Sequence, residues 1–267
     1  MAEHPRAFVL RTAGTNCDAE MVRAFELAGA SVELVHLDAV CADPTRLDAC
    51  DLIGFPGGFS YGDDIASGRI FAMRVREKLY PALRRAAQRG VCMIGACNGF
   101  QVMVQAGLLP GPAAGEPWPD EAPRPTIGLA TNAQARFVDR WVGFAVEPGT
   151  SCVWTDGLEG RSDEQMVLPV AHGEGRIVAD QAVLQSLKAG GHVAVRYTED
   201  VNGSAGQIAG VCDATGRLFG LMPHPERYLD WNRHPSAARL DRATCASVTP
   251  GLAMFESAVA AVRGQLA

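Results

Sequence analysis

The chain has 267 residues, of which 48% are hydrophobic and 20% charged, and its formal net charge is −6. This length is enough to bury one large core. The acidic balance, with no basic run, argues against a nucleic-acid partner, because phosphate neutralisation needs clustered Lys and Arg. No apolar stretch is long enough to span a bilayer, and the start "MAEHPRAFVL" lacks the apolar region of a signal peptide. We therefore expect a cytoplasmic protein that contacts no membrane.

Eight cysteines are scattered along the chain, and none forms a CxxC pair. A structural zinc site needs such paired ligands, so we expect no metal site. In a reducing cytoplasm the cysteines are expected to be free thiols. Seven of them are interpreted as small hydrophobic fillers or incidental surface thiols. Only Cys97 has neighbours that indicate chemistry.

Short apolar runs in the first hundred residues predict four strands, at residues 7–10, 32–37, 52–55 and 91–96. Helical patterns occupy residues 18–28 and 69–89, and each stops at a glycine, Gly29 or Gly90. Strands that alternate with helices predict a parallel sheet with helices on its faces.

The second half of the chain has a different pattern. Residues 110–125 hold many of the prolines and are predicted to be a surface loop. Short, closely spaced runs then predict strands at 126–131, 135–146, 151–155, 166–172, 175–179, 193–198, 208–213 and 218–223. This spacing predicts antiparallel hairpins added to the α/β core, followed by a closing helix at 250–265. We find no repeat and no linker, so residues 1–267 are interpreted as one domain.

The stretch Gly95-Ala96-Cys97-Asn98-Gly99 has the form of a nucleophile elbow, with cysteine in the place of serine. In an elbow the nucleophile stands on a strained turn from strand to helix, so its neighbours must be small. The N-terminus of the following helix stabilises a thiolate. The backbone N–H of Asn98 is then available to an oxyanion. The alternative is a buried structural cysteine in a β–α turn.

A thiol nucleophile needs a base, and His224 in "GLMPHPER" is the best candidate among six histidines. The flanking prolines fix its backbone, and Glu226 is placed to accept its second N–H. The alternative is a rigid surface turn with an incidental histidine. His172, in "AHGEGR", resembles a metal ligand, but two groups two residues apart make a poor site.

The turn Phe55-Pro56-Gly57-Gly58-Phe59 follows the third predicted strand. Adjacent glycines at the carboxyl end of a parallel strand allow a backbone to approach a ligand closely. This turn is a candidate for the second oxyanion donor, although a plain turn before a loop fits the motif equally well.

Seven stretches together resemble one family. In chain order they are "GTNCDAE", "PGGFSYGDDIASGRI", "GACNGFQVM", "ARFVDRWV", "HGEGR", "NGSAGQIAG" and "GLMPHPER". The chain is similar to class I, triad-type glutamine amidotransferases. Among these it most resembles the glutaminase subunits of phosphoribosylformylglycinamidine synthases, over about residues 6–230. The resemblance implies a flavodoxin-like, open and mostly parallel sheet with helices on both faces.

The resemblance also implies roles for the site residues. Cys97 is the nucleophile that attacks the glutamine side-chain amide, His224 is the acid and base, and Glu226 orients His224. The remaining residues implied to form the oxyanion hole or the glutamine pocket are Gly57, Gly58, Phe59, Asn98, Gln101, Arg136 and Phe137.

The family implies L-glutamine as substrate and a separate large synthetase subunit as partner, which receives the ammonia in de novo purine biosynthesis. The synthetase uses ATP and Mg²⁺, whereas this chain has no phosphate-binding G-x-x-x-x-G-K-[ST] motif and is expected to hold no cofactor. A small scaffold subunit is left open. The alternatives are a glutaminase for another synthetase, an unrelated Cys-His hydrolase, or a flavodoxin-like stress protein with an elbow cysteine and no glutaminase activity.

Two segments depart from the family pattern. Residues 110–125 form a proline-rich insertion, and residues 229–249 separate the proposed triad from the closing helix. The sequence assigns no role to either segment.

Overall fold

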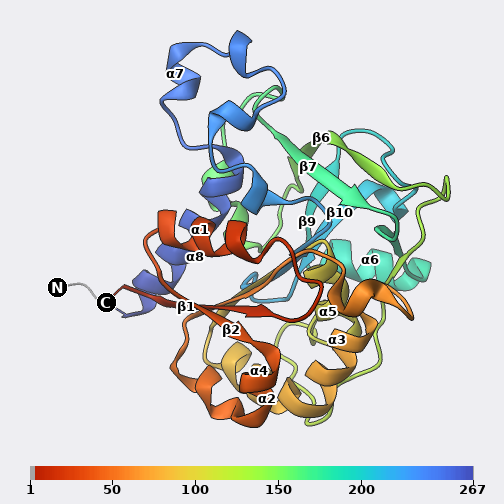
Figure 1. Ribbon diagram of the computed structural model, residues 1–267. Helices are drawn as coiled ribbons and strands as arrows, with labels where there is room; N and C mark the ends of the chain where they lie inside the picture. The colour runs from red at the N-terminus through yellow and green to blue at the C-terminus, as the bar shows by residue number, and fades with distance from the viewer. Residues whose placement is uncertain (1–3, 267) are drawn as a thin grey trace.

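The computed structural model describes residues 4–266, and its centre is one nine-stranded sheet in the order β2-β1-β3-β4-β11-β10-β9-β6-β7 (Figure 1). Its strands are β1 (Arg6–Arg11), β2 (Ser31–His36), β3 (Leu52–Phe55), β4 (Cys92–Ala96), β6 (Val138–Val146), β7 (Val167–His172), β9 (Val193–Tyr197), β10 (Ile208–Cys212) and β11 (Leu218–Leu221). A separate small sheet pairs β5 (Gly128–Ala130) with β8 (Arg176–Val178).

The five strands from β2 to β11 are parallel, and β10, β9, β6 and β7 continue the sheet in antiparallel pairs. This confirms the predicted mostly parallel sheet with added antiparallel strands. The helices are α1 (Asp18–Leu27), α2 (Leu37–Ala42), α3 (Arg69–Arg74), α4 (Tyr80–Gln88), α5 (Asn98–Gln105), α6 (Gln181–Ala189), α7 (Arg242–Cys245) and α8 (Pro250–Leu266).

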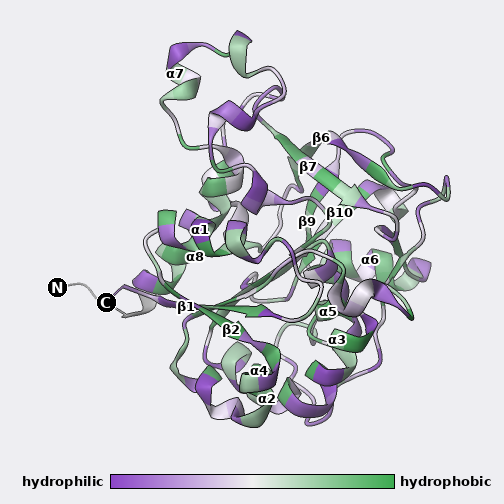
Figure 2. Cartoon of the chain, viewed as in Figure 1, coloured by the Kyte–Doolittle hydropathy of each residue, from purple (hydrophilic) through white to green (hydrophobic). Residues whose placement is uncertain are grey.

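Alternate residues of the central strands pack into two separate hydrophobic cores, one on each face of the sheet. In β1, Phe8 and Leu10 pack in the core on the side of α2 to α5, whereas Ala7 and Val9 pack in the core on the side of α1 and α8. Successive side chains of a strand point to opposite faces, so a strand covered on both faces becomes a continuous apolar run. The hydrophobic central strands are visible between the helical layers (Figure 2).

The helical segment predicted at 69–89 is interrupted. Its middle, Val75–Leu79, is a π-helical turn between α3 and α4. Pro81 lies in the first turn of α4 and has no N–H to donate, so the ordinary hydrogen-bond ladder cannot run through it. The change of ladder accommodates the proline without ending the helical rod.

One predicted strand, at 151–155, is wrong. Residues Val153–Leu158 form a 3₁₀ helix instead. Trp154 is fully buried there, its Nε1 donates to the Arg217 carbonyl over 2.8 Å, and its ring packs edge-on to Phe25 and Phe255. The apolar residues of this stretch therefore pack around one large buried ring. A sequence pattern alone does not distinguish such a stretch from a buried strand. Helix α6 was also not predicted.

The two segments outside the family pattern lie on different parts of the surface. In residues 110–125, the carbonyls of Ala122 and Pro123 accept hydrogen bonds of 2.8 Å from Arg76. Residues 229–249 carry α7 and stand off from the sheet (Figure 1). Buried Trp231 packs edge-on against Tyr228, and its Nε1 donates to the Ser247 carbonyl over 2.6 Å, which ties the two ends of the segment together. That they are insertions stays a prediction, as does the assignment of one domain.

No helix within residues 4–266 is both long and apolar enough to cross a membrane.

Candidate active site

Cys97 stands on a sharp turn between β4 and α5. Its backbone has φ 51° and ψ −108°, a conformation that non-glycine residues rarely adopt. Its N–H donates to the Leu221 carbonyl over 2.8 Å, and its carbonyl accepts from Gln101 over 3.2 Å. These bonds from a neighbouring strand and from the helix hold the strained residue in place, as expected of an elbow nucleophile.

The two glycines of the elbow are required by close packing. A Cβ on Gly99 would overlap the carbonyl oxygen of Phe55 at the end of β3, and a Cβ on Gly95 would lie 2.7 Å from the backbone of Gly99. Helix α5 therefore starts directly against the sheet. Cys97 is 6% exposed, and its Sγ lies 3.6 Å from the Ala171 carbonyl near the end of β7.

His224 follows β11 and lies between two prolines. Hydrogen bonds of its backbone and its side chain hold it in place. Its N–H donates to the Pro169 carbonyl over 2.9 Å, and its Nδ1 lies 2.7 Å from Oε1 of Glu226. An ionised carboxylate can only accept, so Nδ1 carries the proton and Nε2 is left with a lone pair. Nε2 is buried and has no hydrogen-bond partner among the described residues. This is the tautomer that a general base needs.

The charge on His224 is set by its neighbours. Burial opposes the imidazolium, but the charge of Glu226 and, once the thiol has lost its proton, the charge of Cys97 raise the pKa of His224 well above its ordinary value, so the ring readily takes up that proton. Strands β4 and β11 are paired with Ala96 opposite Leu221, so Cys97 and His224, which follow these strands, lie at the same edge of the sheet. The structure thus brings together the three predicted catalytic residues from three separate parts of the chain.

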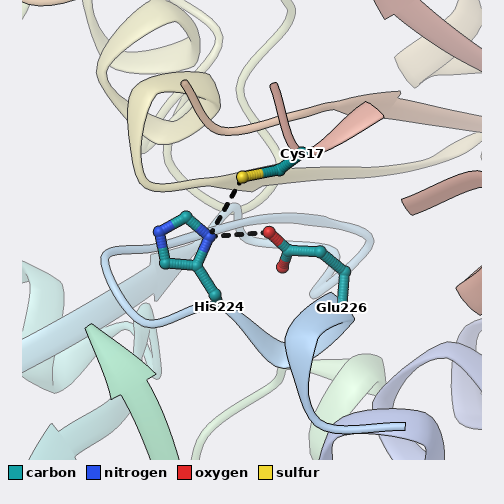
Figure 3. A group of neighbouring side chains, drawn as sticks. All are labelled: Cys17, His224 and Glu226. Carbon is teal, nitrogen blue, oxygen red and sulfur yellow. Dashed lines mark hydrogen bonds and ion pairs between the residues drawn. The ribbon is translucent and has the colours of Figure 1, made fainter. Parts of the chain in front are cut away.

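Cys17 also lies beside His224, a position that its interpretation as a hydrophobic filler or an incidental surface thiol did not anticipate. It caps α1, is 1% exposed, and its Sγ is 3.8 Å from Nδ1 of His224, on the side of the ring that holds Glu226 (Figure 3). Its thiol also donates to Oδ1 of Asn16 over 3.2 Å. Burial raises the pKa of Cys17, which keeps it a neutral thiol. A site with two cysteines was not expected.

The glycine turn at 57–59 is fixed to the loop that precedes α1. The Gly57 carbonyl accepts from the N–H groups of Asn16 and Cys17, over 3.3 and 3.2 Å, and the Phe59 N–H donates to the Gly14 carbonyl over 2.9 Å. The Phe59 N–H is therefore already used. Among the donors of this turn, the N–H groups of Gly57 and Gly58 are the candidates for an oxyanion.

Gly57 forms one wall of the space that holds the His224 ring. A Cβ at this position would lie 2.7 Å from Cε1 of His224 and 3.3 Å from Sγ of Cys17. The absence of a side chain therefore lets the imidazole lie against the backbone of the turn.

Asn98 and Gln101 tie the elbow helix to the surrounding loops. The Asn98 amide donates to Asp63 over 3.2 Å and to Oε1 of Gln101 over 3.1 Å, while Nε2 of Gln101 donates to the Glu174 carbonyl. Both ends of the Gln101 amide are therefore engaged within the protein. Asn98 is the first residue of α5, where the backbone N–H has no partner within the helix.

Phe137 and Arg136 lie at the outer side of this region. Both residues are exposed, and the ring of Phe137 stacks on that of Phe59 with centroids 6.5 Å apart. The Arg136 carbonyl accepts from the amide of Asn132 over 2.9 Å, and the same amide also donates to the His172 carbonyl. The contact with glutamine predicted for all these residues stays a prediction.

His172 is a structural residue of the neighbouring turn. Its Nδ1 is 3.1 Å from Oδ1 of Asn132, and a Cβ on Gly175 would press on its ring. Burial, aided by the charge of His224, lowers the pKa of His172 to about 4. The ring is therefore neutral at neutral pH, held by the asparagine.

One group of three potential metal ligands occurs within residues 4–266. It comprises Cys17, His224 and Glu226, whose potential ligand atoms all lie within 4.8 Å of one another.

The chain is similar to known glutamine amidotransferases. A profile of the CobB/CobQ-like glutamine amidotransferase domain matches residues 4–262. The chain is 40% identical to the phosphoribosylformylglycinamidine synthase subunit PurQ of Dehalococcoides mccartyi, over 86% of this chain and 88% of that protein. It is 42% identical to the protein of the same name from Novosphingobium aromaticivorans, over 83% and 88% of the two chains.

A solved structure, that of PurLQS from Thermotoga maritima, contains a chain with the same architecture. The TM-score is 0.72 and the identity 32%, with 97% of this chain and 99% of that chain covered. The profile match extends over nearly the whole sequence, and the chain therefore belongs to the family of CobB/CobQ-like glutamine amidotransferase domains.

Proposed function

We propose that this chain is the glutaminase subunit of a phosphoribosylformylglycinamidine synthase. It hydrolyses L-glutamine to glutamate and passes the ammonia to an ATP-dependent synthetase subunit, which converts formylglycinamide ribonucleotide to the amidine. The observation that carries the proposal is the position of the strained elbow cysteine, Cys97, and of the buried pair of His224 and Glu226 directly after the paired strands β4 and β11.

The first half of the reaction follows from the positions of these groups. The Cys97 thiol transfers its proton to Nε2 of His224, and the sulfur attacks the side-chain amide carbon of glutamine. The backbone N–H groups of Asn98 and of Gly57 or Gly58 are the candidate donors to the resulting oxyanion. The imidazolium then protonates the departing nitrogen, so ammonia leaves and a thioester remains on Cys97.

The second half uses the same groups in reverse. His224 removes a proton from water, the hydroxide attacks the thioester, and the thiol is restored as glutamate leaves. Glu226 keeps the ring in the tautomer with Nδ1 protonated and stabilises the imidazolium that forms in each half.

The acceptor chemistry belongs to another subunit in this proposal. The chain holds no cofactor of its own, and ATP and Mg²⁺ act in the synthetase. The curated relatives named as PurQ and the likeness to a chain of PurLQS support a synthetase of the PurL type as partner. The same likeness suggests that a third, small subunit takes part.

The experiment is a glutaminase assay of the purified chain, alone and with the synthetase subunit and its nucleotide substrates. We expect ammonia release to increase when the partner is present. Glutamine-dependent formation of the amidine with this synthetase, and with no GMP or CTP synthetase subunit, distinguishes the proposal from other amidotransferases. A stress protein without glutaminase activity would release no ammonia under either condition.

A further inference from the structure

The edge of His224 that faces away from the elbow has more potential ligands than catalysis needs. Nδ1 already has a partner in Oε1 of Glu226, yet Sγ of Cys17 also lies 3.8 Å from it (Figure 3). The second oxygen of Glu226, Oε2, is buried and has no hydrogen-bond partner among the described residues. The side chain of Glu226 is 0% exposed. Oε1 is paired with His224, but a buried carboxylate oxygen without a hydrogen-bond partner is costly, and a cation that binds Oε2 would relieve that cost.

The donor set is that of a zinc-like ion. Thiolate, imidazole and carboxylate are the ligands of Zn²⁺ in proteins. In a tetrahedral site with bonds of about 2.0–2.3 Å, the ligand atoms lie about 3.3–3.6 Å apart. Here the sulfur and nitrogen are 3.8 Å apart and the nitrogen and oxygen 2.7 Å apart, with all three atoms inside 4.8 Å. Small side-chain shifts bring these atoms to tetrahedral spacing.

We propose that Cys17, Nδ1 of His224 and the carboxylate of Glu226 form an inhibitory site for a thiophilic d¹⁰ cation such as Zn²⁺ or Cd²⁺. A water molecule completes the coordination. No redox change is involved: the ion binds the Cys17 sulfur and Nδ1, and the protons that these atoms carried leave for solvent or for Nε2. The resident enzyme needs no such ion, and the site is distinct from the nucleophile Cys97.

The consequence for catalysis lies in the ring tautomer. A metal on Nδ1 takes the lone pair of that nitrogen, so a neutral ring must carry its proton on Nε2. Nε2 can then no longer accept the proton of Cys97. Glu226 is drawn from its hydrogen bond with the ring at the same time. Occupation of the site therefore stops glutamine hydrolysis by locking His224 in the wrong tautomer. This consequence rests on the proposed function, whereas the binding site itself does not.

The test is a titration of the full-length chain with Cd²⁺, followed by the ultraviolet charge-transfer band of the cadmium–thiolate bond. All variants carry Cys41→Ser and Cys245→Ser, because these two thiols are the accessible ones. In this background Cys97→Ala removes the nucleophile, and Cys17→Ser is then added. Cys92→Ala, at another fully buried cysteine, is the matched control.

We expect the Cys97→Ala protein to bind one equivalent of Cd²⁺ with the thiolate band. Addition of Cys17→Ser should abolish the band and weaken binding about 100-fold or more, since even the loss of an outer-shell partner costs 10–100-fold. Cys92→Ala should change nothing. Equal affinities with and without Cys17 would overturn the proposal, as would loss of the band in Cys97→Ala alone, which would place the ion on Cys97 and Nε2.

Circular dichroism shows whether each variant is folded. If the Cys17→Ser protein does not fold, the same titration of Glu226→Gln tests the carboxylate ligand, and an unchanged affinity there contradicts the site. None of these readouts depends on glutamine turnover, so they can fail while the proposed function stands.

Discussion

Nδ1 of His224 and Oε1 of Glu226 lie 2.7 Å apart, and the two side chains are 3% and 0% exposed. A carboxylate with no access to water is stable only when it is paired. The carboxylate of Glu226 therefore holds the imidazole in one tautomer, and water cannot reach the pair to take its place. This relationship, formed within a turn of three residues, fixes the role of the histidine before any substrate is bound.

The triad residues should act as one unit. We expect His224→Ala to lower glutamine hydrolysis about 10²–10⁴-fold, because it removes the acid and base. Glu226→Gln should cost less, since the ring stays in place but loses the carboxylate that stabilises its charge. The double variant should lose little beyond His224→Ala. Steady-state kinetics of the complex measures all three, and additive losses would show that Glu226 works elsewhere.

Gly57 should be critical for activity, because it leaves room for the His224 ring. Gly57→Ala places a methyl group 2.7 Å from Cε1 of His224 and so displaces the ring. A displacement of about 1 Å costs about 10²-fold in rate, and we expect a loss of that size with little change in the melting temperature. The control is Gly264→Ala in α8, where an added Cβ meets nothing within 4 Å. A fully active Gly57→Ala protein would contradict the placement of His224.

His172 should make the fold sensitive to acid. Its pKa is lowered from 6.5 to about 4 by burial in the native state. The unfolded chain takes up the proton first, so the stability contributed by neutral His172 is present above pH 6.5 and falls as the pH drops from there towards about 4. At about pH 5 the loss amounts to about 2 kcal/mol. Urea unfolding at about pH 7.5 and about pH 5 should therefore show a smaller pH-dependent loss in His172→Asn than in the wild type. The same loss in both proteins would exclude this residue as the cause.

The sequence predicted the parts of the fold that depend on local pattern. Strands β3 and β4 are short apolar runs bounded by turns, so their pattern predicts them. The glycines around Cys97 are required by close packing, and the elbow motif predicts this requirement. The run around Trp154 was misread because burial of one indole in a 3₁₀ helix and burial of a strand leave the same apolar composition.

The site was predicted in its chemistry but not in its full membership. His224 and Glu226 are two residues apart, so their pairing could be inferred from the sequence. Cys17 is 207 residues from His224 in the chain, and β3 and β4 separate β1 from β11 in the sheet. Only folding, which packs the loop after β1 on the Gly57 turn next to His224, brings the two side chains together. The motif "GTNCDAE" that carries Cys17 did contribute to the family resemblance, but it gave no indication of a contact with the histidine.

The most direct test is a comparison of Cys97→Ala with the wild type in the assembled complex, with glutamine or with an ammonium salt as the nitrogen donor. The account predicts that Cys97→Ala abolishes amidine formation from glutamine and leaves formation from ammonium at the wild-type rate. Glutamine-dependent turnover that survives Cys97→Ala, or is lost on Cys17→Ala alone while Cys97→Ala remains active, would contradict the assignment of the nucleophile.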